Sequence, residues 1–203
     1  EISAVNDTPL INSPVDLGIT LEDSDLLIRA TDLSSSAFDI EGDSLSIIDL
    51  VANSGTLIEN GDKTWTYRPE LNFNGTTNFT FTVSDGTGTV ANTATLNISS
   101  VNDSPLVASP LIDQTALQGS AFNYQIQPTT FIDPDLNDSL NYSATLDNGD
   151  LLPAWLSFDP TSKTFSGTPG SSDIATLKIQ VLATDTTGLS VADNFTLVTE
   201  AVT

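Results

Sequence analysis

Apolar and polar residues alternate along many short segments of the chain. Examples are "KTWTYRP" at 63–69, "TNFTFTV" at 77–83 and "TLKIQVLA" at 176–183, where apolar residues recur at every second position. This period places the apolar side chains on one face of an extended strand. Clusters of Gly, Asn, Asp, Ser and Pro separate the segments and favour turns. No segment keeps a period of 3.6 residues, so the sequence predicts an all-β protein without long helices.

The predicted strands fall into two halves of seven. Each half spans about a hundred residues, the size of an immunoglobulin-like sandwich. The predicted strands of the first half are 9–13, 26–30, 44–52, 56–59, 63–68, 77–84 and 89–99. Those of the second half are 106–112, 121–126, 139–147, 155–158, 163–166, 174–184 and 189–199. We therefore expect two antiparallel, seven-stranded β-sandwiches, residues 1–100 and 101–203, arranged end to end.

An internal repeat supports this division. Residues 2–14, "ISAVNDTPLINSP", and residues 98–110, "ISSVNDSPLVASP", agree at nine of thirteen positions. Acidic residues also recur at matching places, because "FDIEGDSL" (38–45) aligns with "FIDPDLNDSL" (131–140) and "VSDGTG" (83–88) with "ATDTTG" (183–188). A repeat that keeps its acids in place indicates one structural plan written twice.

The charge of the chain excludes several classes of partner. There are 27 acidic and five basic residues, a formal net charge of −22, and neither Cys nor His. Without a basic face, nucleic acid and anionic membranes are poor partners. Disulfides, thiolate sites and the usual zinc ligands are excluded. No signal peptide or transmembrane run is present, and we expect the chain to be a piece of a longer protein that is monomeric as a fragment.

The acidic loops are predicted to meet where the two halves join. An odd number of strands puts the termini at opposite ends of a sandwich, so the linker and two loops of the second half would face the end of the first half. These segments carry Asn102, Asp103, Asp133, Asp135 and Asp185, with Asp138 nearby, and the loop after the first strand of the first half would bring Glu22 to the same joint. Five carboxylates and one amide oxygen are thus expected to converge there. An all-oxygen, carboxylate-rich set suits Ca²⁺, whereas Mg²⁺ demands tighter octahedral geometry.

Two other interpretations of the acids can be weighed. An EF-hand is excluded, because a loop starting at Asp133 would need Gly and Glu where Asp138 and Ala144 stand. The acids could instead only solvate the surface, which we favour for scattered residues such as Asp16 and Asp113. For the repeated loop clusters we favour calcium.

The chain resembles the cadherin-like repeats of large bacterial surface proteins. The first half, with "LED" (21–23), "TWTYRPELNFNG" and "FTFTVSDGTG", resembles the tandem cadherin-like repeat of repeats-in-toxin adhesins. The second half, with "FIDPDLNDSLNYSATLDNGDLLPAWLSFDPTSKTFSGTP", resembles the dystroglycan-type cadherin-like domain.

The resemblance implies Greek-key sandwiches with Ca²⁺ between successive domains. It maps the ligands at the joint onto the six residues named above, and it implies a second set for a joint with a preceding domain: Asn6, Asp7, Asp39, Glu41 and Asp85. One departure is Gln118, which stands in the second half where the first has Glu22.

These observations lead to one functional hypothesis and two alternatives. The hypothesis is an extender of a large secreted or cell-surface bacterial adhesin, extracellular and stiffened by Ca²⁺, whose partners are neighbouring cadherin-like domains. The first alternative is a carbohydrate-binding module of an adhesin or secreted polysaccharidase, which would need exposed aromatic residues; Trp65, Tyr67 and Trp155 are instead expected in the core. The second is calcium-dependent homophilic adhesion. No nucleophile–base pair or phosphate-binding loop is present, so we expect no enzyme.

Overall fold

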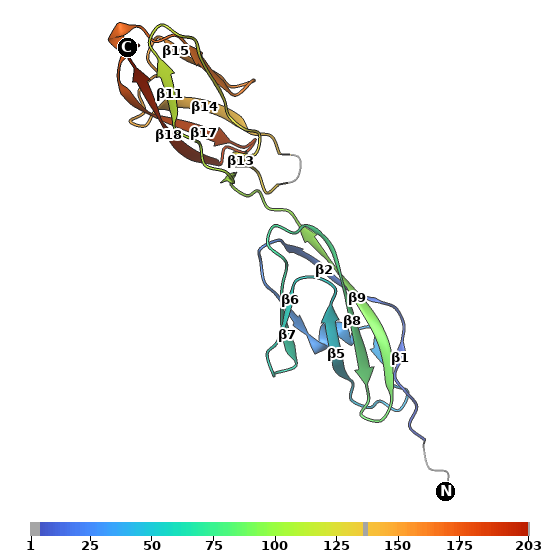
Figure 1. Ribbon diagram of the computed structural model, residues 1–203. Coiled ribbons are helices and arrows are strands. Elements are labelled where there is room, and N and C mark those ends of the chain that lie inside the picture. Colours follow the sequence, from blue (N-terminus) through green and yellow to red (C-terminus); the bar gives the residue numbers. More distant parts are fainter. Residues whose placement is uncertain (1–4, 136–137, 203) are drawn as a thin grey trace. The chain divides into compact units, whose positions relative to one another are not determined.

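The chain forms two compact units. The structure, a computed structural model, describes residues 5–135 and 138–202. Residues 1–101 form the first unit and residues 102–203 the second, called domain 1 and domain 2 below (Figure 1). Residues 1–4 and 203, which the predicted domain ranges include, lie outside the described residues.

Domain 1 is a sandwich of a four-stranded and a three-stranded sheet. The larger sheet has the order β2 (Val15–Leu21), β9 (Thr89–Ser99), β8 (Gly75–Ser84), β5 (Ser46–Ala52). The smaller sheet has the order β3 (Leu26–Arg29), β7 (Thr64–Arg68), β6 (Thr56–Glu59). A short ribbon pairs β1 (Leu10–Ile11) with β4 (Ala37–Phe38), and the short helix α1 (Ala30–Leu33) follows β3.

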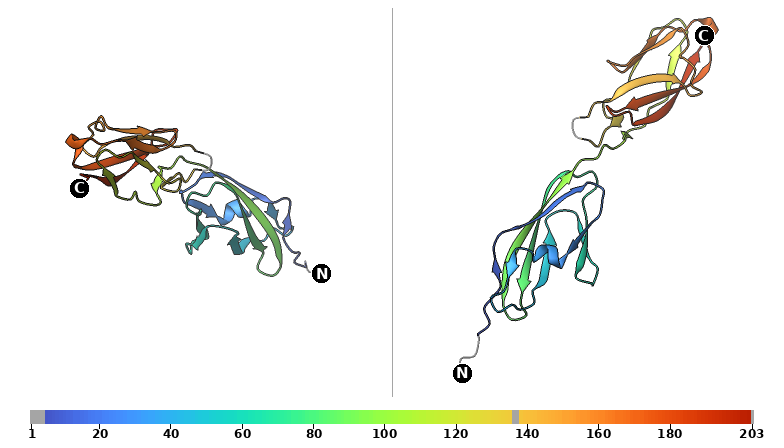
Figure 2. Two further views of the ribbon diagram at one scale, coloured as in Figure 1. Left: turned by 45° about the horizontal axis from the view of Figure 1, so that its top comes forward. Right: turned by 180° about the vertical axis from the view of Figure 1, so that it is seen from behind.

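Domain 2 repeats this plan strand for strand. Its four-stranded sheet has the order β11 (Gln114–Leu117), β18 (Ser190–Glu200), β17 (Thr176–Thr184), β14 (Asn141–Leu146). Its three-stranded sheet has the order β12 (Phe122–Gln125), β16 (Thr164–Gly167), β15 (Leu156–Asp159). The ribbon pairs β10 (Leu106–Val107) with β13 (Phe131–Ile132), and a 3₁₀ turn covers Ser171–Asp173. Figures 1 and 2 show the long strands β8 and β9, and likewise β17 and β18, lying side by side.

The alternation of the sequence fills the cores as predicted. Along β8, Phe79, Phe81 and Val83 are buried, and the residues between them face outward. Trp65 and Tyr67 on β7 point into the same core. There the rings of Tyr67 and Phe79 pack edge-to-face, with 5.0 Å between their centroids. The all-β, Greek-key architecture of two seven-stranded sandwiches is confirmed. Within the described residues, no helix is long and apolar enough to cross a bilayer.

The prediction for the first strand of each half was wrong. Residues 106–112 do not form one strand. Instead, β10 pairs with β13 in the short ribbon, and the chain then continues to the four-stranded sheet, which it joins as β11. Likewise 9–13 is replaced by β1 and β2. Both β2 and β11 run parallel to the last strand of their domain, against the expected antiparallel pairing throughout. Where a chain passes from one sheet to another, it changes its pairing partner. The alternation of apolar and polar residues is local and does not indicate which strands pair.

Candidate metal centre

Three segments bring acidic residues together at one end of domain 2. The first precedes β10 and carries Asn102 and Asp103, the second lies between β13 and β14, and the third is the turn between β17 and β18 with Asp185. These segments adjoin because β10 pairs with β13 and β17 pairs with both β14 and β18. The sheet register therefore gathers residues that are more than eighty positions apart.

A chain of hydrogen bonds connects these acidic residues. The backbone N–H of Asp103 donates to Asp135 Oδ2 at 2.7 Å, and the backbone N–H of Asp135 donates to Asp133 Oδ1 at 3.0 Å. The side-chain amide of Asn102 donates to Asp185 Oδ2 at 2.9 Å and to the Asp103 carbonyl at 3.0 Å. The carboxylates of Asp133, Asp135 and Asp185 are thus held in fixed orientations. The side-chain oxygen of Asn102 could serve as a ligand, because its amide nitrogen makes the hydrogen bonds.

Asp185 is the most tightly held carboxylate of this group. Its side chain is 3% exposed, and its Oδ1 accepts the backbone N–H groups of Thr187, Gly188 and Leu189 at 2.8, 2.6 and 2.9 Å. Burial alone would raise the pKa of Asp185, but the hydrogen bonds from Asn102 and these backbone groups outweigh it and lower the pKa. These hydrogen bonds therefore favour the ionised form of Asp185.

Asp133 lies among carboxylates that repel one another. One carboxylate oxygen from each of Asp133, Asp138 and Asp185 lies within 4.8 Å of the others. Asp133 Oδ2 is buried and has no hydrogen-bond partner among the described residues. Burial, followed by the charges of Asp138, Asp135 and Asp185, raises the pKa of Asp133 above its ordinary value. A cation between these oxygens would remove both the repulsion and the unpaired oxygen.

Domain 1 carries the same arrangement with its own residues. The Asn6 amide donates to Asp85 Oδ2 and to the Asp7 carbonyl, both at 3.0 Å. The Asp7 N–H donates to Glu41 Oε2 at 3.2 Å, and the Glu41 N–H donates to Asp39 Oδ1 at 2.9 Å. Asp39 Oδ2, like its counterpart Asp133 Oδ2, is buried and without a partner among the described residues. The structure thus brings together the second predicted set within domain 1, and Asn102, Asp103, Asp133, Asp135 and Asp185 of the first set within domain 2, whereas Glu22 belongs to domain 1.

Asp85 occupies the place of Asp185. Its Oδ1 accepts the N–H groups of Thr87 and Gly88 at 2.7 and 2.6 Å. The hydrogen bonds from Gly88, Asn6 and Thr87 hold the pKa of Asp85 well below its usual range. Both turns therefore present an ionised carboxylate to their loops.

Glu22 follows β2, at the end of domain 1 where β9 also finishes. The side chain is 2% exposed; Oε1 accepts the backbone N–H of Val101 at 2.6 Å, and Oε2 accepts the Asn74 amide at 3.4 Å. Gln118 follows β11 in the same way: the N–H of Glu22 donates to Ser99 O, and that of Gln118 donates to Glu200 O. Domain 2 thus has a neutral amide at the position where domain 1 has a buried carboxylate.

Asp138 was undervalued in the sequence analysis, which placed it near the site rather than in it. Its carboxylate belongs to the cluster with Asp133 and Asp185, and Thr186 Oγ1 donates to its Oδ1 at 2.8 Å. The signal was present, because the repeat aligns Asp138 with Asp43. Its proximity to Asp185, 47 positions later in the chain, could be seen only in the fold.

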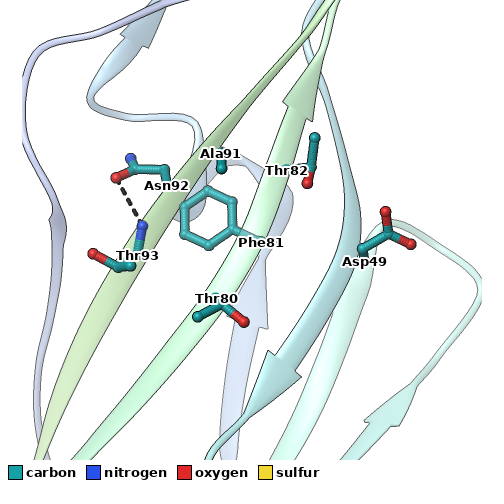
Figure 3. A pocket seen from close by; sticks show the side chains of 7 residues that line it. All are labelled: Asp49, Thr80, Phe81, Thr82, Ala91, Asn92 and Thr93. Carbon is teal, nitrogen blue, oxygen red and sulfur yellow. Dashed lines mark hydrogen bonds between the residues drawn. The ribbon is translucent and has the colours of Figure 1, made fainter.

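A second kind of candidate site lies on the four-stranded sheet of domain 1. A hollow of about 500 Å³ is lined by Asp49, Thr80, Phe81, Thr82, Ala91, Asn92 and Thr93 (Figure 3). Asp49 is the single carboxylate there, so this hollow holds neither a carboxylate pair for glycoside hydrolysis nor a metal cluster. Phe81 is 3% exposed and offers no face for stacking on a sugar ring.

Comparison with known families agrees with the two-domain architecture. Residues 5–99 match the family model of a cadherin-like domain, and residues 104–200 match the model described as "Putative Ig domain". No curated protein matches the chain.

Solved structures of cadherins share the fold. The chain is 16% identical to mouse cadherin-23 EC22–24, covering 100% of this chain and 68% of that one with a TM-score of 0.63. It is 16% identical to Drosophila N-cadherin EC1–4, covering 96% and 50% with a TM-score of 0.58.

An enzyme is also among the structures found. The chain is 25% identical to an endo-fucoidan hydrolase from glycoside hydrolase family 107, with a TM-score of 0.42. The match covers 96% of this chain and 29% of that enzyme.

Proposed function

We propose that the protein is a calcium-stabilised extender of a larger extracellular adhesin. The carrying observation is the repeated loop cluster, in which a buried carboxylate oxygen of Asp39 or Asp133 has no partner among the described residues. Cadherin-like and immunoglobulin-like domains suit an adhesion or extender role, and their tandem arrangement suits a stalk. A bacterial surface protein of the repeats-in-toxin class, with a dystroglycan-type second domain, is the setting that the sequence resemblance supports.

The donor set fits Ca²⁺. Each cluster offers carboxylate and amide oxygens only, which hard cations prefer. Ca²⁺ accepts six to eight oxygens at variable angles, whereas Mg²⁺ requires a near-ideal octahedron. When bound, the ion supplies positive charge that neutralises the carboxylates. The chain's own contribution is to orient the oxygens through the Asn102–Asp185 and Asp103–Asp135 hydrogen bonds.

We further propose that Glu22 contributes to binding from the end of domain 1. The residue is buried with its carboxylate against the N–H of Val101, one position before Asn102 in the chain. A carboxylate held so close in sequence to the first oxygen ligands of domain 2 would couple calcium binding to the linker. The proposed partners are accordingly the neighbouring domains of the same chain.

Thermal melts and small-angle scattering, in CaCl₂ and in EDTA, test the proposal. With a Kd of about 10⁻⁴–10⁻³ M, typical of extracellular modules, about 10 mM CaCl₂ stabilises each site by roughly 1.4–2.7 kcal/mol. That raises the melting temperature by about 6–15 °C. Calcium should also narrow the distribution of particle dimensions. MgCl₂ at the same concentration is the control, and equal responses to both salts, or to neither, would contradict the proposal.

The alternatives predict different results. A carbohydrate-binding module would need exposed aromatic rings, yet of the aromatic residues, all of which lie in the described part of the chain, only Phe38 is exposed, at 41%. Trp65 is 8% exposed, and Trp155 packs edge-to-face on Phe122. Calcium-dependent retention on a glycan array would favour this alternative. Homophilic adhesion predicts instead that sedimentation shows association rising with calcium and protein concentration.

A further inference from the structure

The turns before β7 and β16 each carry a lysine in a left-handed backbone conformation. The φ angles are 64° at Lys63 and 56° at Lys163. Each carbonyl accepts an equivalent backbone N–H, from Ala30 at 3.0 Å and from Ile126 at 2.9 Å. A left-handed conformation costs a residue with a Cβ roughly 1–2 kcal/mol, and Gly or Asn would adopt it more easily. The backbone conformation therefore does not explain why lysine occupies these positions. Because the two turns have the same backbone geometry, each lysine can serve as a control for the other.

The side chains of these two lysines lie in different surroundings. Lys63 is exposed, whereas Lys163 is half-buried. The Lys163 ammonium donates to Tyr142 Oη at 3.2 Å and lies 4.3 Å from the centre of the Tyr142 ring. In domain 1 the place of Tyr142 is taken by Ile47, which pairs with Val83 as Tyr142 pairs with Ala183. Only in domain 2 is the lysine fixed in position by an aromatic ring.

The fixed ammonium lies beside the candidate metal ligands. A hollow of about 430 Å³ in domain 2 is lined by Lys163, Tyr142 and three of the clustered acids, Asp133, Asp135 and Asp138. The hollow beside Lys63 is lined by Ala30, Leu45, Ser46, Ile47, Glu59, Gly61 and Trp65, none of them a proposed ligand. Ion pairs within 4.0 Å among the described residues join Arg68 to Asp25 and Lys178 to Asp147, and none involves Lys163. Lys163 therefore shares this hollow with the acids without forming a salt bridge to them.

We propose that Lys163 is a built-in counter-charge that sets the calcium affinity of domain 2. The inference rests on the proposed calcium site. Without the ion, the ammonium offsets part of the repulsion among Asp133, Asp135 and Asp138. When Ca²⁺ binds, the ammonium and the ion repel each other across the hollow that Lys163 shares with these acids, so binding is weaker than the acids alone would give. In domain 1 the equivalent Lys63 is exposed, so we expect no such effect on the calcium affinity of that domain.

The test compares Lys163→Gln with Lys63→Gln and Lys163→Arg in the two-domain protein. Calcium is titrated by calorimetry at about 20 mM NaCl and at about 1 M NaCl, where the Debye length falls to roughly 3 Å. The domain 2 site is the binding step that Asp133→Asn removes. Lys163→Gln should tighten that step about three- to tenfold at low salt and much less at high salt. Lys63→Gln and Lys163→Arg should stay within about twofold of the unmodified protein.

The failure of this inference is distinguishable from the failure of the calcium site. If the unmodified protein binds calcium and Lys163→Gln binds it equally well, the role of Lys163 is overturned while the site stands. If no variant binds calcium, the proposed function fails and the control of calcium affinity fails with it, and melting in EDTA then decides only whether Lys163 offsets the repulsion among the acids. At low salt Lys163→Gln should then melt below Lys63→Gln, because the repulsion is no longer offset. Equal melting temperatures would overturn the counter-charge role.

Discussion

Asp133→Asn should stabilise domain 2 in the absence of calcium and remove its stabilisation by calcium. In the calcium-free protein, Asp133 Oδ2 is buried without a partner among the described residues, and the nearest oxygens of Asp138 and Asp185 lie within 4.8 Å. The substitution removes the charge but keeps the oxygen that accepts the Asp135 N–H at 3.0 Å. The folded state should therefore become more stable in EDTA and should lose its response to calcium.

The magnitude follows from the separation of the charges. Two unit charges 4.8 Å apart repel by about 3 kcal/mol at an effective dielectric of 20 and by about 1 kcal/mol in water. Asp133→Asn should thus raise the unfolding free energy of domain 2 in EDTA by about 1–3 kcal/mol, or the melting temperature by about 5–15 °C, with the smaller values at high salt. In calcium the unmodified protein should gain a comparable amount that the variant does not.

Differential scanning calorimetry in EDTA and in CaCl₂ measures both effects. Asp147→Asn is the control, because it removes the same charge from a surface pair with Lys178, 3.7 Å away; it should change neither the EDTA melt nor the calcium response appreciably. Asp39→Asn should repeat the Asp133 result in domain 1. A variant at Asp133 that is less stable in EDTA, or that keeps the full calcium response, would refute the reasoning.

Two further predictions concern the fold that positions the loops. Gly167→Ala would place a Cβ 1.9 Å from the Trp155 carbonyl oxygen. The unfolding free energy of domain 2, measured by urea denaturation with tryptophan fluorescence, should fall by about 2–3 kcal/mol. An unchanged midpoint would mean that the backbone adjusts to the added methyl group. Asp193→Ala removes the acceptor of the Leu111 N–H, 2.7 Å away at a residue 9% exposed, and should cost about 1–3 kcal/mol in the same assay. Asp193→Asn keeps an acceptor oxygen and should cost less, and equal losses in the two variants would contradict this role.

The acidic loops show which site residues the internal repeat of the sequence could identify. The alignment of "FDIEGDSL" with "FIDPDLNDSL" identified Asp39 and Asp133 as equivalents. In both residues Oδ2 is buried and has no hydrogen-bond partner in the part of the chain that the structure describes. Repetition supplies this information because one loop constrains the interpretation of the other. The membership of Asp138 in the cluster required the fold, since its proximity to Asp185 depends on the pairing of β14 with β17.

The sequence by itself determined which residues face inward along each strand. A period of two is a local property, so the burial of Trp65 and Tyr67, and the all-β class, could be predicted without knowing which strands pair. Tertiary structure alone decided where the chain crosses from β10 to β11, and that β11 lies parallel to β18. It also decided that Lys163, but not Lys63, is fixed against a ring beside the acids. These features depend on contacts between residues far apart in the chain, whose register is set by the packing of the two sheets and leaves no period in the sequence.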